Sequence, residues 1–205
     1  MMLSTLTYLF DPLCGWCYGA APAIERLAQQ AGFLVQLSPT GLFAGAGGRI
    51  MDAGFAEIAW SHDLRIAEKT GQVFSQAYRS QVLGQHGSRF DSACATLALT
   101  AVSLTAPQYE LAALKHFQLA RYVRGLDITD LRVVTVLLNE IACVAAAERL
   151  AQADAELNSV NYARMQHSQA LIRSYGMTGV PQIIISDHTG SRLADPEILW
   201  GQRAK

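Results

Sequence analysis

Cys14 and Cys17 are the two residues of this chain whose types and spacing most clearly indicate a chemical reaction. The two thiols stand two residues apart, after a short apolar run and where a helical pattern begins. A thiolate at a helix N-terminus faces unpaired backbone N–H groups and the positive end of the peptide dipoles, which favour its charge. The second thiol lies one turn further on, within reach of a disulfide. The pattern predicts a redox pair, with Cys14 as an exposed nucleophile and Cys17 as the buried resolving thiol.

The residues between the cysteines, Gly15 and Trp16, are expected to tune the pair. They decide how many backbone N–H groups face Cys14 and what shields its sulfur, and Trp16 adds a flat apolar surface for a substrate chain. One alternative is a pair of structural cysteines on an amphipathic helix. Another is a zinc site, but no second Cys-x-x-Cys or His pair follows at a typical ligand interval. We therefore expect redox exchange and no metal.

Cys94 and Cys143 are the other two cysteines, and both stand in segments rich in small apolar residues with a helical pattern. A free cysteine in such a segment is most simply a small core residue. The alternatives are a second resolving or regulatory thiol, or a zinc site completed in space. We expect core packing for both.

Val180 and Pro181 stand directly before an apolar strand pattern, where a proline is tolerated. On the residues alone a trans bond is favoured, since only about 5–6% of X–Pro bonds in folded proteins are cis. A cis bond would leave the backbone of Val180 unpaired and able to hold an extended substrate. The residues by themselves leave these alternatives open.

The first part of the chain predicts a β-α-β unit. Residues 3–10 read as a buried strand, residues 14–31 as an amphipathic helix and residues 33–37 as a second strand. A unit of this kind favours parallel strands. From about residue 52 to 175 the period is almost entirely helical, with a last long helix expected over 159–175.

Strand patterns return only near the end of the chain. Residues 182–186 and 191–193 read as a hairpin, and Asp195 with Pro196 opens a short helix. The order β-α-β, helical block, β-β-α predicts an α/β protein with a thioredoxin-type core interrupted by a large helical insertion and a sheet of mixed direction. We expect the core to comprise residues 1–45 and 158–205, and the insertion residues 46–157.

Composition excludes some classes of partner. The net charge of −1 over 205 residues gives no reason to expect nucleic acid or an anionic membrane surface. No apolar stretch approaches the roughly 20 residues that cross a bilayer. The first basic residue is Arg26, so the apolar N-terminus lacks the basic region of a secretory signal. We expect a cytoplasmic protein.

The segment Phe10-Asp11-Pro12-Leu13-Cys14-Gly15-Trp16-Cys17, with Gly179-Val180-Pro181 far downstream, resembles the DsbA-like thioredoxin family and its FrnE-like cytoplasmic branch. The resemblance covers nearly the whole chain, because this family also carries a helical insertion. It implies thiol–disulfide oxidoreductase or isomerase activity on protein or small-molecule disulfides. It also implies no tightly bound cofactor, glutathione as a candidate redox partner, and a cis proline at Pro181 packed against the disulfide.

The sequence also departs from the strongly oxidising members, which carry Pro-His between the cysteines. Gly15-Trp16 supplies no histidine to stabilise the Cys14 thiolate, so a lower reduction potential is expected. Two alternatives remain open. One is a glutathione-binding kappa-type transferase or isomerase of the same fold, although these usually carry a serine near the position of Cys14. The other is a chaperone-like module with an apolar groove around Trp16 and Pro181.

Overall fold

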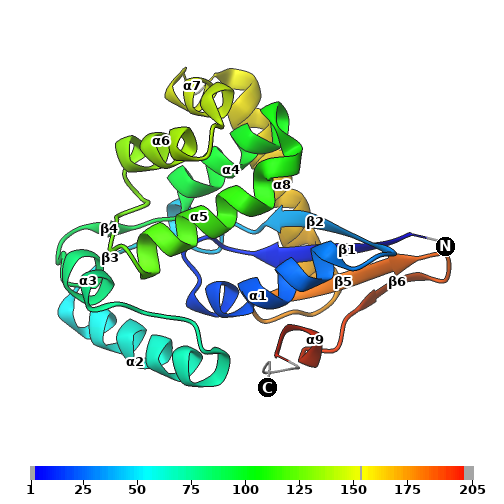
Figure 1. The fold of residues 1–205 in the computed structure, drawn as a ribbon, viewed down its shortest axis with the longest axis horizontal. Coiled ribbons are helices and arrows are strands. Elements are labelled where there is room, and N and C mark those ends of the chain that lie inside the picture. Colours follow the sequence, from blue (N-terminus) through cyan, green and yellow to red (C-terminus); the bar gives the residue numbers. More distant parts are fainter. Residues whose placement is uncertain (1–2, 153, 201–205) are drawn as a thin grey trace.

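The computed structural model describes residues 3–152 and 154–200. The chain begins with a β-α-β unit: strand β1 (Ser4–Phe10), helix α1 (Gly15–Gln29) and strand β2 (Phe33–Pro39). The two strands are parallel over their whole length. β1 and the second half of β2 are largely buried, and α1 packs beside them through its own apolar face (Figure 1). The predicted parallel unit is confirmed.

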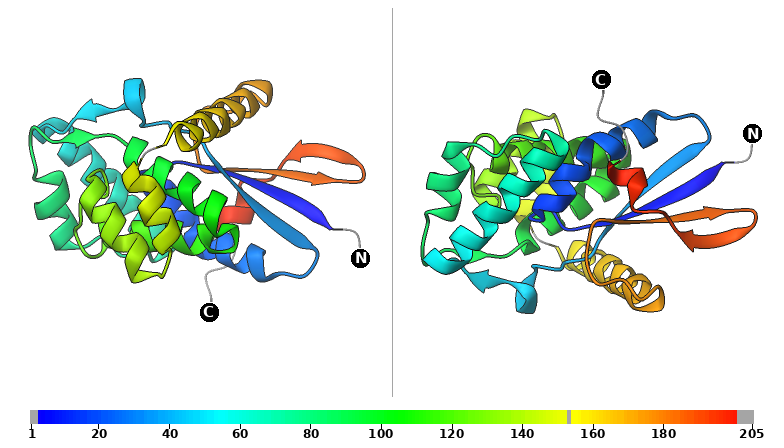
Figure 2. Two further views of the ribbon diagram at one scale, coloured as in Figure 1. Left: turned by 90° about the horizontal axis from the view of Figure 1, so that it is seen from above. Right: turned by 90° about the horizontal axis from the view of Figure 1, so that it is seen from below.

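Two later strands complete the sheet. β5 (Gln182–Asp187) pairs antiparallel with β1, and β6 (Gly190–Leu193) pairs antiparallel with β5. The strand order is therefore β2-β1-β5-β6, a mixed sheet with β1 in its centre. Figure 2 shows α1 and the short α9 (Glu197–Trp200) on one face of this sheet and α8 (Ala155–Ser174) on the other.

The segment between β2 and α8 is mainly helical and lies where β1 leads into α1 (Figure 1). It also contains two short paired strands, β3 (Arg49–Ile50) and β4 (Arg89–Phe90), which a two-residue pattern could not predict. Its helical elements are α2 (Ala53–Thr70), α3 (Gln76–Tyr78), α4 (Ala93–Thr105), α5 (Glu110–Tyr122), α6 (Leu131–Glu140) and α7 (Val144–Gln152), with the single turns η1 (Gly45–Gly47), η2 (Arg79–Leu83) and η3 (Pro107–Tyr109).

Capping residues explain where the helices begin and end. Asp52 accepts a hydrogen bond from the backbone of Phe55 and starts α2, and Gly71 ends it with a positive φ of 78°. The long helix expected from residue 159 begins earlier, at Ala155, because Asp154 caps it. That expected boundary was wrong, since an N-cap aspartate outweighs the weak apolar pattern that follows it.

An aromatic cluster joins the helical segment to the thioredoxin-like core. The rings of Tyr18 on α1 and Tyr122 on α5 stack with centroids 4.7 Å apart. Phe74 and Tyr78 pack against this pair at ring distances of 5.0–5.3 Å, and their own rings are 6.2 Å apart. Such pairs stabilise beyond their buried area. The residues after the Cys-x-x-Cys motif are therefore held by helices that come from the insertion.

Within the described residues, no helix is long and apolar enough to cross a membrane.

Candidate functional site

Cys14 lies at the turn from β1 into α1 and is the N-cap residue of that helix. Its sulfur accepts a hydrogen bond from the backbone N–H of Cys17 at 3.4 Å. The N-cap position normally belongs to an oxygen side chain that satisfies one of the free N–H groups of the first turn. Here a sulfur takes that place, so the helix directs a donor at the nucleophile proposed from the sequence.

Asp11 shapes the turn that presents Cys14, and sequence reasoning did not identify it. Its carboxylate is fully buried and accepts hydrogen bonds from the N–H of Leu13 at 2.9 Å and of Phe43 at 3.1 Å, and from the Ser92 hydroxyl at 2.7 Å. Burial raises the pKa of Asp11, and these donors oppose that shift. The Asp11-Pro12 pair, separated from the motif by Leu13, is the sequence signal for this turn.

Val180 and Pro181 lie against Cys14, although 166 positions separate Val180 from it in the chain. The Cys14 thiol donates to the carbonyl oxygen of Val180 at 3.7 Å. The Val180–Pro181 bond is cis, and Pro181 is buried at the start of β5. The structure thus brings together the two sequence features singled out above, from opposite ends of the chain.

Cys17 lies inside the core with no exposed surface, as expected of a resolving thiol. Burial raises its pKa well above the usual value for a thiol, and the neighbouring Cys14 sulfur raises it further. The Tyr8 hydroxyl donates to the carbonyl oxygen of Cys17 at 3.2 Å. All four cysteines are free thiols, so the site is in its dithiol form.

Cys14 is less accessible than the sequence suggested. The expected exposed sulfur was wrong, because the residue retains only 7% exposure. The Val180 carbonyl lies over it, and residues that precede the helix pack around it. Reaction with a disulfide therefore has to take place at a narrow opening.

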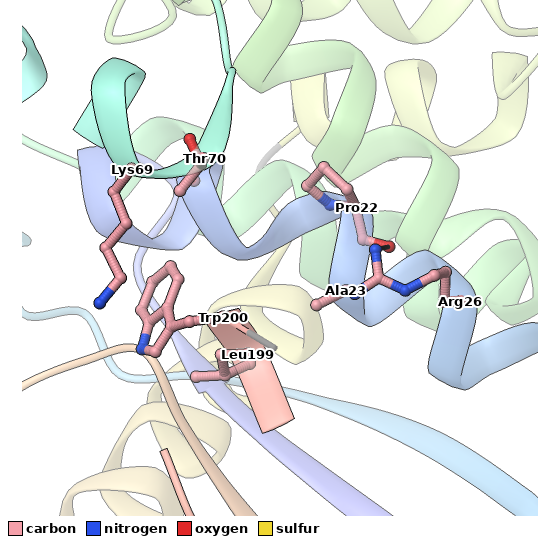
Figure 3. A pocket seen from close by; sticks show the side chains of 8 residues that line it. Pro22, Ala23, Arg26, Lys69, Thr70, Leu199 and Trp200 are labelled. Carbon is pink, nitrogen blue, oxygen red and sulfur yellow. Dashed lines mark hydrogen bonds between the residues drawn. The ribbon is translucent and has the colours of Figure 1, made fainter. Parts of the chain in front are cut away.

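Trp16 packs edge-on against Trp200 of α9, with ring centroids 5.5 Å apart. The Lys69 ammonium lies 5.3 Å above the same Trp200 ring. A pocket of about 50 Å³ lies on this flank of α1, and Cys14 is not among its lining residues. Figure 3 shows how Lys69 and Trp200 lie at this pocket. The pocket is lined by Gly19, Pro22, Ala23, Arg26, Lys69, Thr70, Leu199 and Trp200.

A buried polar cluster lies behind Gly15, and sequence reasoning missed it. Asp63 of α2 is 5% exposed and accepts a hydrogen bond from the Tyr78 hydroxyl at 3.0 Å. Burial raises the pKa of Asp63 to about 7, while Tyr78 and Arg121 oppose the shift. The Arg121 guanidinium is itself buried, 5.5 Å from the Tyr78 ring and 5.8 Å from the Tyr122 ring. A carboxyl group that titrates near neutrality thus lies against the first residue of the motif helix.

Gly15 has no side chain, and this leaves room for the Asp63 carboxyl group beside it. A β-carbon at Gly15 would lie 2.4 Å from Oδ1 of Asp63. The glycine between the cysteines is therefore required by the insertion that packs on it.

Cys94 is half-buried on α4, and Cys143 is buried. Cys143 does not lie on a helix, as the pattern had suggested, but in the turn before α7, where Ala142 has a positive φ of 58°. Burial raises the pKa of both thiols, that of Cys94 to about 11. Among the described residues, no group of three or more His, Cys, Asp or Glu side chains could hold a metal ion.

Comparison with known proteins places this geometry in a family. The model of the DSBA-like thioredoxin domain matches residues 5–203. The cytosolic disulfide reductase DsbM from Pseudomonas aeruginosa is 32% identical, with a TM-score of 0.86 over 97% of this chain and 92% of that one. The chain belongs to the DSBA-like thioredoxin domain family. It has the fold of that family and is an oxidoreductase of the DsbA-like class.

Further structures resemble the chain. DsbM is also known with glutathione, at 32% identity and a TM-score of 0.84, over 97% of this chain and 93% of that one. A putative protein disulfide isomerase from Nitrosomonas europaea shares the fold at 23% identity and a TM-score of 0.79, over 98% and 91% of the two chains. A search of curated proteins found no match.

Proposed function

We propose that the protein catalyses thiol–disulfide exchange through a mixed disulfide, with Cys14 as nucleophile and Cys17 as resolving thiol. One observation carries the proposal: Cys14 caps α1, so that its sulfur receives the Cys17 N–H and lies under the Val180 carbonyl. Exchange requires a thiolate, and helix N–H groups favour one. The buried Cys17 sits one turn behind, where it can attack the bond between Cys14 and a substrate.

Gly15 and Trp16 tune this pair in our proposal, and Val180 with Pro181 holds the substrate. The Val180 carbonyl lies beside the sulfur that would carry the substrate. A backbone acceptor at this point suits an extended peptide, whose N–H groups need partners. Trp16, with Trp200 beside it, supplies the apolar surface. We further propose the division into a core of residues 1–45 and 158–205 and an insertion of residues 46–157.

Glutathione is the proposed redox partner, and reduction of protein or small-molecule disulfides the proposed direction. The 32% identical DsbM is described as a cytosolic disulfide reductase and has been solved with glutathione. The motif lacks a histidine, which fits a reducing pair. Lys69 places a positive charge beside Trp200, which itself packs on Trp16 of the motif. A cytoplasmic location, with its reducing glutathione pool, is part of the same proposal.

The experiment that tests the proposal traps the intermediate. Wild type, Cys14→Ser and Cys17→Ser are each mixed with glutathione disulfide and quenched in acid. The mass of each intact protein is then measured by mass spectrometry. Cys17→Ser should accumulate one glutathione on Cys14, because no thiol resolves it. Cys14→Ser should acquire none at this site and lose all turnover. Disulfide reductase activity retained by Cys14→Ser would refute the mechanism.

A further inference from the structure

Arg121 on α5 is a buried cation close to the residues that hold the active-site turn, residues 11–14. It is 1% exposed, and two of its guanidinium nitrogens, Nε and Nη2, have no hydrogen-bond partner within the described part of the chain. A buried charge of this kind is costly unless opposite charge lies nearby. The surroundings of Arg121 show where that opposite charge is. Because the inference concerns the reactivity of Cys14, it rests on the proposed function.

Two tyrosine rings beside Arg121 lead to the active-site turn and to the motif helix. The guanidinium carbon lies 5.8 Å from the centre of the Tyr122 ring, and the Tyr122 hydroxyl donates to the carbonyl oxygen of Leu13 at 2.8 Å. The same carbon lies 5.5 Å from the centre of the Tyr78 ring, whose hydroxyl donates to Asp63. The Asp63 carboxyl in turn packs on the first residue of the motif helix. Ring faces of this kind attract a cation.

A third ring, that of Phe90, leads to Asp11 inside the turn. The guanidinium carbon of Arg121 lies 5.3 Å from the centre of the Phe90 ring, and the Phe43 ring packs on Phe90 with centroids 4.9 Å apart. The backbone N–H of Phe43 and the hydroxyl of Ser92, two residues after Phe90, both donate to Asp11. Arg121 therefore packs on the segments that supply two of the hydrogen bonds of Asp11.

Asp11 is the negative charge that faces this cation from the turn. Both of its oxygens accept a backbone N–H and one also accepts a hydroxyl, which is the bonding of an ionised carboxylate. Burial raises the pKa of Asp11, and both these donors and the positive charge of Arg121 oppose that shift. The Asp11 charge also acts on the thiols: burial raises the pKa of Cys17, and the negative charge of Asp11 raises it further. An uncompensated Asp11 carboxylate would likewise oppose a thiolate at Cys14, three residues along the chain.

We propose that Arg121 is a positioning residue for the exchange reaction: its charge offsets that of the buried Asp11 carboxylate, so that the turn holds this carboxylate without opposing the Cys14 thiolate. The three rings fix the guanidinium between the segments that hold the turn. The insertion thus supplies a charge that acts on the nucleophile of the core.

Other titratable groups also face this cluster. Those that stay neutral at pH 7, because burial raises the pKa of each, are Tyr8, Cys17, Tyr78 and Tyr122. Asp127, after α5, adds a negative charge that acts on Arg121. Burial raises the pKa of Asp63 to about 7, so this carboxyl is only partly ionised there. Its contribution has to be separated from that of Asp11 by experiment.

The test measures the charge around Cys14 in proteins that carry Cys17→Ser. Each is treated with iodoacetamide, an uncharged reagent, at pH values from about 5 to 9, and alkylation of the peptide with Cys14 is followed by mass spectrometry. Only a thiolate reacts, so the midpoint of the rate-against-pH curve reports that charge. Arg121→Met should raise the midpoint by about half a pH unit or more, because it removes a positive charge near the thiolate. Asp11→Asn should lower it, and the double variant should return it towards the starting value.

The controls separate charge from packing. Arg121→Lys keeps the charge but loses the planar group that packs on the rings, so it should retain the starting midpoint even where stability falls. Arg173→Met, at an exposed position of α8, is the matched control for the methionine change. Adding Asp63→Asn to each protein should leave the opposite effects of Arg121→Met and Asp11→Asn in place.

Two results would overturn the inference. One is an unchanged midpoint in Arg121→Met, and the other is a midpoint that Asp11→Asn fails to lower in the Arg121→Met background. If Arg121→Met does not fold by itself, Asp11→Asn is compared with the double variant, in which no carboxylate of the turn is left uncompensated. Equal midpoints in those two proteins would also refute the role of Arg121. If Cys17→Ser protein forms no mixed disulfide with glutathione disulfide, the proposed function fails instead.

Discussion

Gly15 and Asp63 lie so close that no side chain fits between them: an added β-carbon would lie 2.4 Å from Oδ1 of Asp63. Alanine is normally the better helix former. Here Gly15→Ala should instead lower the free energy of unfolding by roughly 1–3 kcal/mol, the usual cost of overpacking, because the buried Asp63 carboxyl is held by Tyr78. Chemical denaturation of the reduced protein measures the change.

The control for this prediction is the same change at a position where the neighbouring atom is exposed and has to move by only a few tenths of an ångström. Gly54→Ala, at the second residue of α2, adds a β-carbon 3.3 Å from an exposed Asp52 oxygen and should change stability little. In an Asp63→Ala background the penalty of Gly15→Ala should largely vanish, which a double-mutant cycle detects. An equal penalty in both backgrounds would show that Asp63 is not its cause.

Asp63 should make the protein less stable as the pH rises from about 4 to about 7. Its pKa is about 7 in the folded protein, against about 4 in an unfolded chain. Between these values the native state binds more protons than the unfolded state, so stability falls with rising pH. Asp63→Asn should therefore flatten part of this fall.

Urea denaturation at pH 5, 6, 7 and 8 compares the two proteins. Burial also raises the pKa of Asp11 and of Glu110, so a residual slope of the same sign should persist in Asp63→Asn. Unchanged slopes in the variant would contradict the assignment of a titrating carboxyl to this position.

The Cys14–Cys17 pair should be reducing. Because no histidine stands between the cysteines, we expect a reduction potential of roughly −230 to −270 mV, in the range of glutaredoxins and thioredoxin. Equilibration in glutathione buffers, followed by alkylation and mass spectrometry, gives the value. A potential of roughly −120 to −180 mV would place the protein with oxidants and isomerases. Failure to form a Cys14–Cys17 disulfide would contradict the redox function itself.

Tyr122 should support the active-site turn from a distance. Its buried hydroxyl donates to the carbonyl oxygen of Leu13 at 2.8 Å. Tyr122→Phe leaves that carbonyl without its partner and should cost roughly 1–3 kcal/mol of stability. Because the turn holds Cys14, the alkylation rate of Cys14 should change as well. Tyr109→Phe, at a half-exposed ring, is the control expected to alter neither quantity.

Cys94 and Cys143 should not take part in exchange. Burial raises the pKa of Cys94 to about 11 and also raises that of Cys143, so little thiolate forms at pH 7. Cys94→Ala and Cys143→Ala should each retain the wild-type rate of disulfide reduction, measured with an insulin or glutathione assay. A tenfold loss in either would assign that cysteine a redox role.

The sequence predicted those parts of the fold whose signals are local. β1, α1 and β2 follow from apolar runs and spacing within 40 residues, and Asp195 with Pro196 marks the start of a short helix by the capping chemistry of these two residues. Asp63 and Arg121 could not be found in this way, because their importance arises from packing between α2, α5 and α1. Cys14 was identified from spacing alone, but its burial depends on Val180, which only the folded chain brings to it.

The carbonyl that covers Cys14 comes from a residue made 166 positions later in the chain. At about 5–20 residues per second, a ribosome needs roughly ten to thirty seconds to add that length. The nascent protein therefore has its thiol pair well before the residue that shields it. Until Val180 has been added and can reach Cys14, this thiol lacks its cover and is open to whatever oxidants surround the ribosome.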